Sequence, residues 1–145
     1  MIKRILVTEE IADIGIDRLR NAGFEVDVQL GASGKKLHAA LAGASALIVR
    51  SATQVDVAAL EAGRDLVVVG RAGVGLDNID VEAATTRGVM VVNAPESNVL
   101  SAAEHTIGMM LAMARNIPQA HGALKSGRWE RSRWEGIELA GKTLG

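Results

Sequence analysis

The sequence predicts an α/β domain built on a parallel sheet with helices on both faces. Two observations favour this class. Five short apolar runs recur about every twenty residues, and helix-like segments separate them. Most runs are continuously apolar rather than alternating, which is typical of strands covered on both faces. The predicted strands are residues 5–7, 26–28, 46–49, 66–69 and 89–92.

The segments between these runs have helical features and end at glycines. Residues 11–19 place apolar side chains at helical spacing, and Gly23 follows as a stop signal. Thr53 and Asp56 suggest a weak capping box before the third helix. The remaining predicted helices are residues 36–41, 55–60 and 81–86. This alternation predicts a doubly wound, flavodoxin-like sheet of five parallel strands in the order 2-1-3-4-5.

The character of the chain changes after Pro95. Ser101 and Glu104 have capping-box spacing, which predicts a long helix over residues 101–115. This helix is apolar nearly all round, so it needs cover on more than one side. We expect the preceding sheet to have both faces covered already, which favours another domain or another chain as the cover over burial in the domain's own core. The interface residues predicted on this helix are Met109, Met110 and Met113.

A more polar arm follows the apolar helix. Residues 116–136 predict a second helical stretch and a charged loop that carries Trp129 and Trp134. A tryptophan displayed on an arm is a usual interface anchor, although each ring can also fold back onto its own domain. Residues 139–145 resemble the beginning of another strand. We therefore expect one domain over residues 1–97, a helix and arm over 98–145, and a homodimer formed through 101–136.

Composition excludes several classes of function. The 145-residue chain has a formal net charge of −1 and no polybasic run, which argues against nucleic-acid and membrane-surface partners. It contains no cysteine, so disulfides and thiolate metal sites are excluded and a reducing compartment is expected. No signal-peptide pattern follows the N-terminus, and we expect a cytoplasmic location. The histidines lack metal-ligand spacing, so we predict no metal site. We also predict no catalytic residue in this chain.

Ligands of open parallel sheets bind beyond the carboxyl ends of the strands. Arg50 and Ser51 follow the third strand, and Arg71 and Gly73 follow the fourth, its neighbour in the predicted order. Two adjacent guanidinium groups repel each other unless an anion joins them, and arginine fits phosphate and carboxylate oxygens. With Asn98 after the fifth strand, these residues predict an anion pocket. The alternative is that both arginines pair with surface carboxylates.

Gly73 and Gly75 also begin a dinucleotide-binding fingerprint. Asn78 stands where the third glycine belongs, and the match follows the fourth strand rather than the first. We therefore do not interpret this segment as a pyrophosphate loop.

Several motifs closely resemble the N-terminal region of D-3-phosphoglycerate dehydrogenases, a branch of the D-2-hydroxyacid dehydrogenases. The resemblance covers the whole chain and implies NAD-dependent oxidation of 3-phosphoglycerate, the first step of serine biosynthesis. The motifs are residues 49–53, 69–80, 93–98, 101–104 and 127–131.

The resemblance also implies roles for individual residues. It places a cofactor contact at Val74, where many members have threonine, so only the backbone contact is retained. It implies that Arg131 reaches the active site of a neighbouring subunit and that Trp129 anchors the dimer. The substrate-binding roles that it implies fall on Arg50, Ser51, Arg71, Gly73 and Asn98, a small phosphorylated hydroxy acid being the ligand.

In the family, the NAD-binding loop and the catalytic arginine, glutamate and histidine come after the segment that matches Gly145. The resemblance therefore implies a truncated chain that binds no NAD and is inactive alone. One alternative is a non-enzymatic, self-associating flavodoxin-like module. Another is a different 2-hydroxyacid dehydrogenase of the same superfamily.

Overall fold

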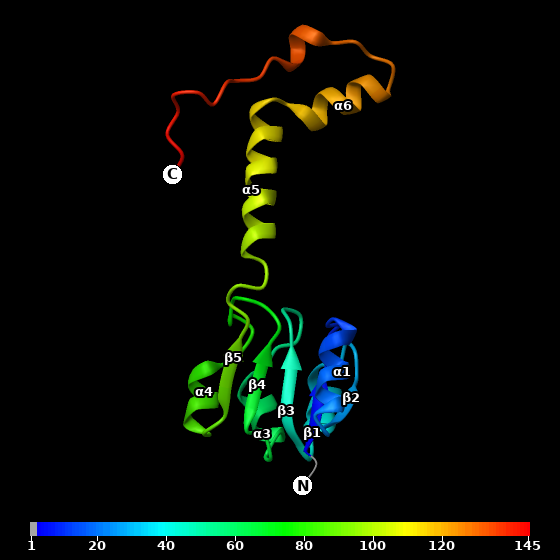
Figure 1. The fold of residues 1–145 in the computed structure, drawn as a ribbon, viewed down its shortest axis with the longest axis vertical. Coiled ribbons are helices and arrows are strands. Elements are labelled where there is room, and N and C mark those ends of the chain that lie inside the picture. Colours follow the sequence, from blue (N-terminus) through cyan, green and yellow to red (C-terminus); the bar gives the residue numbers. More distant parts are fainter. Residues whose placement is uncertain (1–2) are drawn as a thin grey trace. The chain divides into compact units, whose positions relative to one another are not determined.

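The computed structural model describes residues 3–145 and divides the chain into two compact units, Met1–Asn98 and Val99–Gly145. The first unit alternates strands and helices around a five-stranded sheet (Figure 1). The strands are β1 (Arg4–Val7), β2 (Glu25–Val28), β3 (Ala44–Val49), β4 (Val68–Arg71) and β5 (Met90–Asn93). The helices are α1 (Asp13–Asn21), α2 (Gly34–Leu41), α3 (Val57–Ala62) and α4 (Val81–Thr86).

All strand pairs are parallel, and the strand order is β2-β1-β3-β4-β5. The fold class and strand order predicted from the sequence are thus confirmed. Leu6, Leu47 and Val69 are register partners across β1, β3 and β4, and all three are fully buried on one face. This row of side chains forms the main core together with residues of α2, α3 and α4.

The opposite face of the sheet is covered only in part. Ile5 and Val7 of β1 pack there against Ile16 of α1. Over β4 and β5 the same face stays open: Met90 is 63% exposed and Val92 is 44% exposed. Our expectation that both faces are fully covered is therefore wrong for β4 and β5.

Right-handed crossovers explain this asymmetry. The chain moves in one direction across the sheet from β1 to β2, and in the other direction from β2 to β3, β4 and β5. Because each crossover has the same hand, α1 lies on one face while α2, α3 and α4 lie on the other.

Two local expectations in the first unit are corrected. The fourth strand begins at Val68 rather than at Leu66, because Leu66 turns back to hydrogen-bond Gly63 before the ladder begins. The expected Thr53–Asp56 capping box does not form. Asp56 is itself the N-cap of α3, where its side chain accepts a 2.8 Å hydrogen bond from the Ala59 N–H.

The second unit contains α5 (Val99–Ala114), α6 (Ile117–Lys125) and a 3₁₀ turn, η1 (Arg131–Trp134). The expected Ser101–Glu104 capping box is wrong because α5 begins two residues before Ser101. Asn116 separates the two long helices in a left-handed conformation (φ 50°), and its Nδ2 donates to the Glu135 carbonyl at 2.9 Å. Residues 139–145 form a turn and no strand, since no neighbouring strand pairs with them.

Helix α5 is exposed within its own unit despite its apolar sequence. Met109 and Met113 are 60% and 77% exposed, whereas Met110 is half-buried. Burial in the unit's own core, one of our two interpretations, is therefore not observed. No helix within residues 3–145 is both long and apolar enough to cross a bilayer.

The two sheet faces predict different costs for truncating an apolar side chain. Leu47→Ala should lower the free energy of unfolding by about 2–5 kcal/mol, because Leu47 is fully buried and its loss leaves a cavity. Met90→Ala should cost less than about 1 kcal/mol, because Met90 is already mostly exposed. Urea denaturation of both variants checks this, and equal losses would contradict the open face described above.

Candidate functional site

A pocket of about 690 Å³ lies in the first unit, where β3, β4 and β5 end. The structure brings together along its wall five of the six residues predicted to bind substrate, and Val74 as well; the sixth, Arg131, lies in the second unit. The lining residues are Glu10, Ile11, Ala12, Arg50, Ser51, Arg71, Ala72, Gly73, Val74, Gly75, Ser97 and Asn98. Their binding roles stay predictions, but one concave surface contains them all.

The guanidinium of Arg71 is directed along its own loop. Its Nε donates to the Arg50 carbonyl at 3.1 Å, and its Nη1 donates to the Gly75 carbonyl. Asp77 lies 3.7 Å from Nη1, but its side chain is 82% exposed. The Arg71 side chain is only 10% exposed, but the exposure of Asp77 and the 3.7 Å separation make this ion pair weak. Arg50, by contrast, forms no ion pair with any residue in the range 3–145.

The alternative that both arginines pair with surface carboxylates is therefore seen for Arg71 only, and only with Asp77. The two arginines lie at neighbouring strand ends, since Val49 of β3 is the register partner of Arg71. A hydrogen bond from the Arg71 side chain to the Arg50 backbone carbonyl joins them.

Glycines leave room for the Arg71 side chain. A Cβ at Gly75 would lie 2.8 Å from both Arg71 Nη1 and Asp77 Oδ1, so any larger residue there must displace them.

The N–H of Gly73 is not available to a ligand, because it donates to the Arg71 carbonyl at 2.9 Å. The N–H groups of Ser51, Val74 and Gly75 make no hydrogen bond within the described residues, although all three line the pocket. The backbone donors open to an anion are thus the N–H groups of Ser51, Val74 and Gly75.

A carboxylate that sequence reasoning missed shapes the loop after β3. We call residues 50–53 the Arg50 loop. Glu9 Oε1 accepts from the N–H of Arg50 at 2.8 Å and of Thr53 at 2.9 Å, while Oε2 accepts from the N–H of Ala52 at 3.0 Å. Glu9 comes two residues after β1, which neighbours β3, so its place at the same sheet edge was the available signal.

These contacts also shift the acidity of Glu9. Partial burial raises the pKa of its carboxyl group, but the three backbone N–H groups and the Thr53 side chain stabilise the ionised form. The net effect is a pKa below the ordinary value of 4.5.

Asn78 holds the carbonyl side of the same loop. Its buried Nδ2 donates to the Arg50 carbonyl at 2.8 Å and to the Thr53 carbonyl at 2.7 Å. Beneath the loop, the buried hydroxyls of Thr8 and Thr53 are hydrogen-bonded at 2.9 Å. The position that breaks the dinucleotide fingerprint therefore has a structural function, because a glycine at 78 would leave both carbonyls without this donor.

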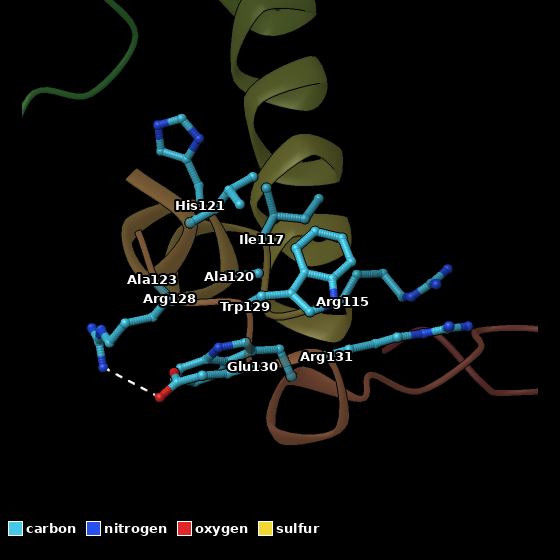
Figure 2. A pocket seen from close by; sticks show the side chains of 11 residues that line it. Arg115, Ile117, Ala120, His121, Ala123, Arg128, Trp129, Glu130 and Arg131 are labelled. Carbon is cyan, nitrogen blue, oxygen red and sulfur yellow. Dashed lines mark hydrogen bonds and ion pairs between the residues drawn. The ribbon is translucent and has the colours of Figure 1, made fainter. Parts of the chain in front are cut away.

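A second pocket, of about 400 Å³, lies in the second unit between α6 and the residues that follow it (Figure 2). Trp129 and Arg131 both line it, and the Trp129 side chain is 78% exposed. Trp134 is half-buried beside them, with the Arg133 guanidinium 5.1 Å from its ring centroid. Of the two tryptophans, Trp134 folds back onto its own unit and Trp129 does not.

The described residues do not provide a site for the NAD pyrophosphate. The first βα turn of such a site needs glycines and backbone donors. Here that turn carries Glu9 and Glu10, whose negative charges would repel a pyrophosphate. Val74 has no hydroxyl to offer, and its carbonyl already accepts from Asn93 Nδ2 at 2.6 Å. No cluster of His, Asp or Glu within residues 3–145 has an arrangement that could hold a metal ion.

Comparison with known proteins identifies the family. Residues 5–141 match the model of the D-isomer specific 2-hydroxyacid dehydrogenase catalytic domain. A D-3-phosphoglycerate dehydrogenase from Archaeoglobus fulgidus is 50% identical over 142 residues, which are 98% of this chain and 27% of that protein. The chain therefore belongs to the D-isomer specific 2-hydroxyacid dehydrogenase family, and it spans about a quarter of the length of that curated relative.

Solved structures agree with this assignment. A Thermus thermophilus protein superposes with a TM-score of 0.83 at 30% identity, covering 94% of this chain and 45% of the other. An NAD⁺-bound 3-phosphoglycerate dehydrogenase from Entamoeba histolytica superposes with a TM-score of 0.71 at 31% identity, covering 79% of this chain and 40% of the other.

The lowered pKa of Glu9 predicts a stability that depends on acidity. The folded-state pKa lies below the unfolded value of 4.5, so the stabilisation is complete above that value and is lost as the pH falls through the lowered pKa. Glu9→Gln should lower the free energy of unfolding by about 2 kcal/mol at pH 7, because hydrogen bonds to a charged group are lost.

The measurement is urea denaturation of both proteins between pH 7 and strongly acidic pH. The difference between wild type and Glu9→Gln should shrink as the pH falls below 4.5. A difference that stays constant with pH would show that the charge of Glu9 contributes nothing.

Proposed function

We propose that this chain is the substrate-binding part of an NAD-dependent D-3-phosphoglycerate dehydrogenase of serine biosynthesis, and that its pocket binds 3-phosphoglycerate. One observation carries the proposal: Arg50, Arg71 and three unpartnered backbone N–H groups line a single pocket at the carboxyl edge of the sheet. Phosphate and carboxylate are the groups that arginine and backbone donors recognise best. The name of the Archaeoglobus fulgidus relative supports the same substrate.

Each pocket residue has a distinct role in this proposal. Arg50 and Arg71 neutralise the two acidic groups of the ligand, and Ser51 and Asn98 donate hydrogen bonds to its oxygens. Gly73 has no Cβ, so the ligand can approach the backbone closely there. Because Asp77 holds Arg71 only weakly, a phosphate or carboxylate can replace it.

In the whole enzyme, bound NAD would supply the hydride acceptor, and Val74 would contact it through its backbone alone. The residues of this chain bind and orient the hydroxy acid, while other parts of the enzyme hold the cofactor and move the proton. We place the enzyme in the cytoplasm.

The binding proposal predicts the effect of removing one arginine. Arg71→Ala should weaken binding of 3-phosphoglycerate by about 10- to 100-fold, the loss expected for one charge-assisted interaction. Isothermal titration calorimetry at fixed ionic strength measures this. Arg64→Ala is the matched control, because Arg64 is exposed and lies outside the pocket.

Equal affinities for wild type and Arg71→Ala would remove the proposed substrate site. Unphosphorylated glycerate serves as a second ligand. If it binds as tightly as 3-phosphoglycerate, the pocket belongs to a different 2-hydroxyacid dehydrogenase.

We also propose that the protein is a homodimer through residues 101–136, in which the exposed face of α5 packs against a second chain. Met109, Met110 and Met113 contribute apolar area there, and Trp129 is the anchor. Arg131 then contributes to the neighbouring subunit's active site. The exposure of α5 within its own unit supports this arrangement.

Light scattering tests the dimer. The wild-type chain should have twice the monomer mass, and Met113→Glu should shift it toward the monomer, because a charge would be buried at the interface. Met90→Glu is the control, since Met90 is a similarly exposed methionine outside residues 101–136. A wild type that is monomeric at all concentrations, or one that both variants disrupt equally, contradicts the proposal.

A further inference from the structure

The Arg50 loop is folded around a carboxylate that is not among the residues proposed to bind the ligand. We propose that Glu9 is a positioning residue of the anion pocket: its ionised carboxylate fixes the backbone that aims Arg50 and Ser51 at the ligand. This inference rests on the function proposed above. Glu9 itself does not line the pocket, although the next residue, Glu10, does.

Glu9 satisfies several backbone donors of the loop at once. Three of the four consecutive N–H groups of the loop converge on its two oxygens, at 2.8, 2.9 and 3.0 Å. Thr53 is buried, so its N–H would be costly to leave without an acceptor, and the loop conformation depends on this carboxylate. A neutral side chain of the same shape offers one acceptor oxygen and presents donors where the second oxygen was.

The loop that Glu9 holds is connected to both arginines. The Arg50 peptide group is held from its carbonyl side by Asn78 Nδ2 at 2.8 Å and by Arg71 Nε at 3.1 Å. Glu9 holds the N–H of the same residue. A shift of the loop at Glu9 therefore moves Arg50 directly and removes the acceptor that orients Arg71.

Glu9 also determines which backbone donors of the loop remain open to a ligand. Consecutive backbone N–H groups form a ready site for an anion from solution. Glu9 occupies this site from within the protein, so the ligand cannot use those three donors. Ser51 is the exception in the loop: its N–H makes no hydrogen bond within the described residues, and Ser51 lines the pocket. Within the Arg50 loop, the ligand is thus restricted to the Ser51 N–H and the side chains.

The decisive experiment compares Glu9→Gln with wild type in the 145-residue chain. With 3-phosphoglycerate as the probe, calorimetry should show affinity weaker by about tenfold or more, the loss expected when a charge-assisted network that orients two arginines is removed. Glu25→Gln is the matched control, because it makes the same charge change at an exposed position of β2. Its affinity should equal that of wild type.

Amide NMR supplies a readout that a purely structural role would not change, and it needs no variant. When 3-phosphoglycerate is added to wild type, the Ser51 amide signal should move. The Ala52 and Thr53 amide signals should stay nearly fixed, because their protons remain bonded to Glu9. If the Ala52 and Thr53 signals move most, the ligand displaces Glu9 and the inference is overturned, even where Glu9→Gln does not fold.

The outcomes also separate this inference from the proposed function. If wild type binds, Arg71→Ala binds weakly and Glu9→Gln binds like wild type, then Glu9 has no positioning role while the substrate site stands. If wild type does not bind at all, the proposed function fails and this inference fails with it.

Discussion

The burial of one row of side chains across the sheet determines where the candidate site lies. Leu6, Leu47 and Val69 pair across β1, β3 and β4, and their burial fixes the register of the three strands. A slip of one residue would turn this whole row toward the opposite face. Because the register is fixed, the residues that follow each strand reach the same edge together. Glu9 and Arg50 meet there, next to Arg71 at the end of β4.

Much of this arrangement could be predicted from the sequence. Continuous apolar runs that alternate with helical segments predict a flavodoxin-like strand order, and that order makes Arg50 and Arg71 neighbours. Helix starts were predicted less well, because the Asp56 and Ser101 patterns depend on where the helix begins to within one or two residues. The open face over β4 and β5 was missed, although the predicted strand order and right-handed crossovers together place only α1 on that face.

The support beneath the site could not be predicted from composition. Glu9 looks like one of several surface acids, and only its contacts with three N–H groups distinguish it. Asn78 looked like a defect in a nucleotide-binding fingerprint, but its amide holds two carbonyls. In both cases the decisive partners are backbone groups, which every residue carries and which no sequence pattern identifies. The same limit applied to Trp129 and Trp134, whose exposures differ although both lie in one charged loop.

The weak ion pair between Arg71 and Asp77 affects how tightly the pocket can bind an anion. Without a ligand, Arg71 already has carbonyl acceptors and a nearby carboxylate, so an arriving anion exchanges one set of partners for another. Affinity is then the difference between two satisfied arrangements, which keeps it moderate. The Asp77 carboxylate thus competes with the anion for the Arg71 guanidinium, and the distance between the two groups sets how readily Asp77 is displaced.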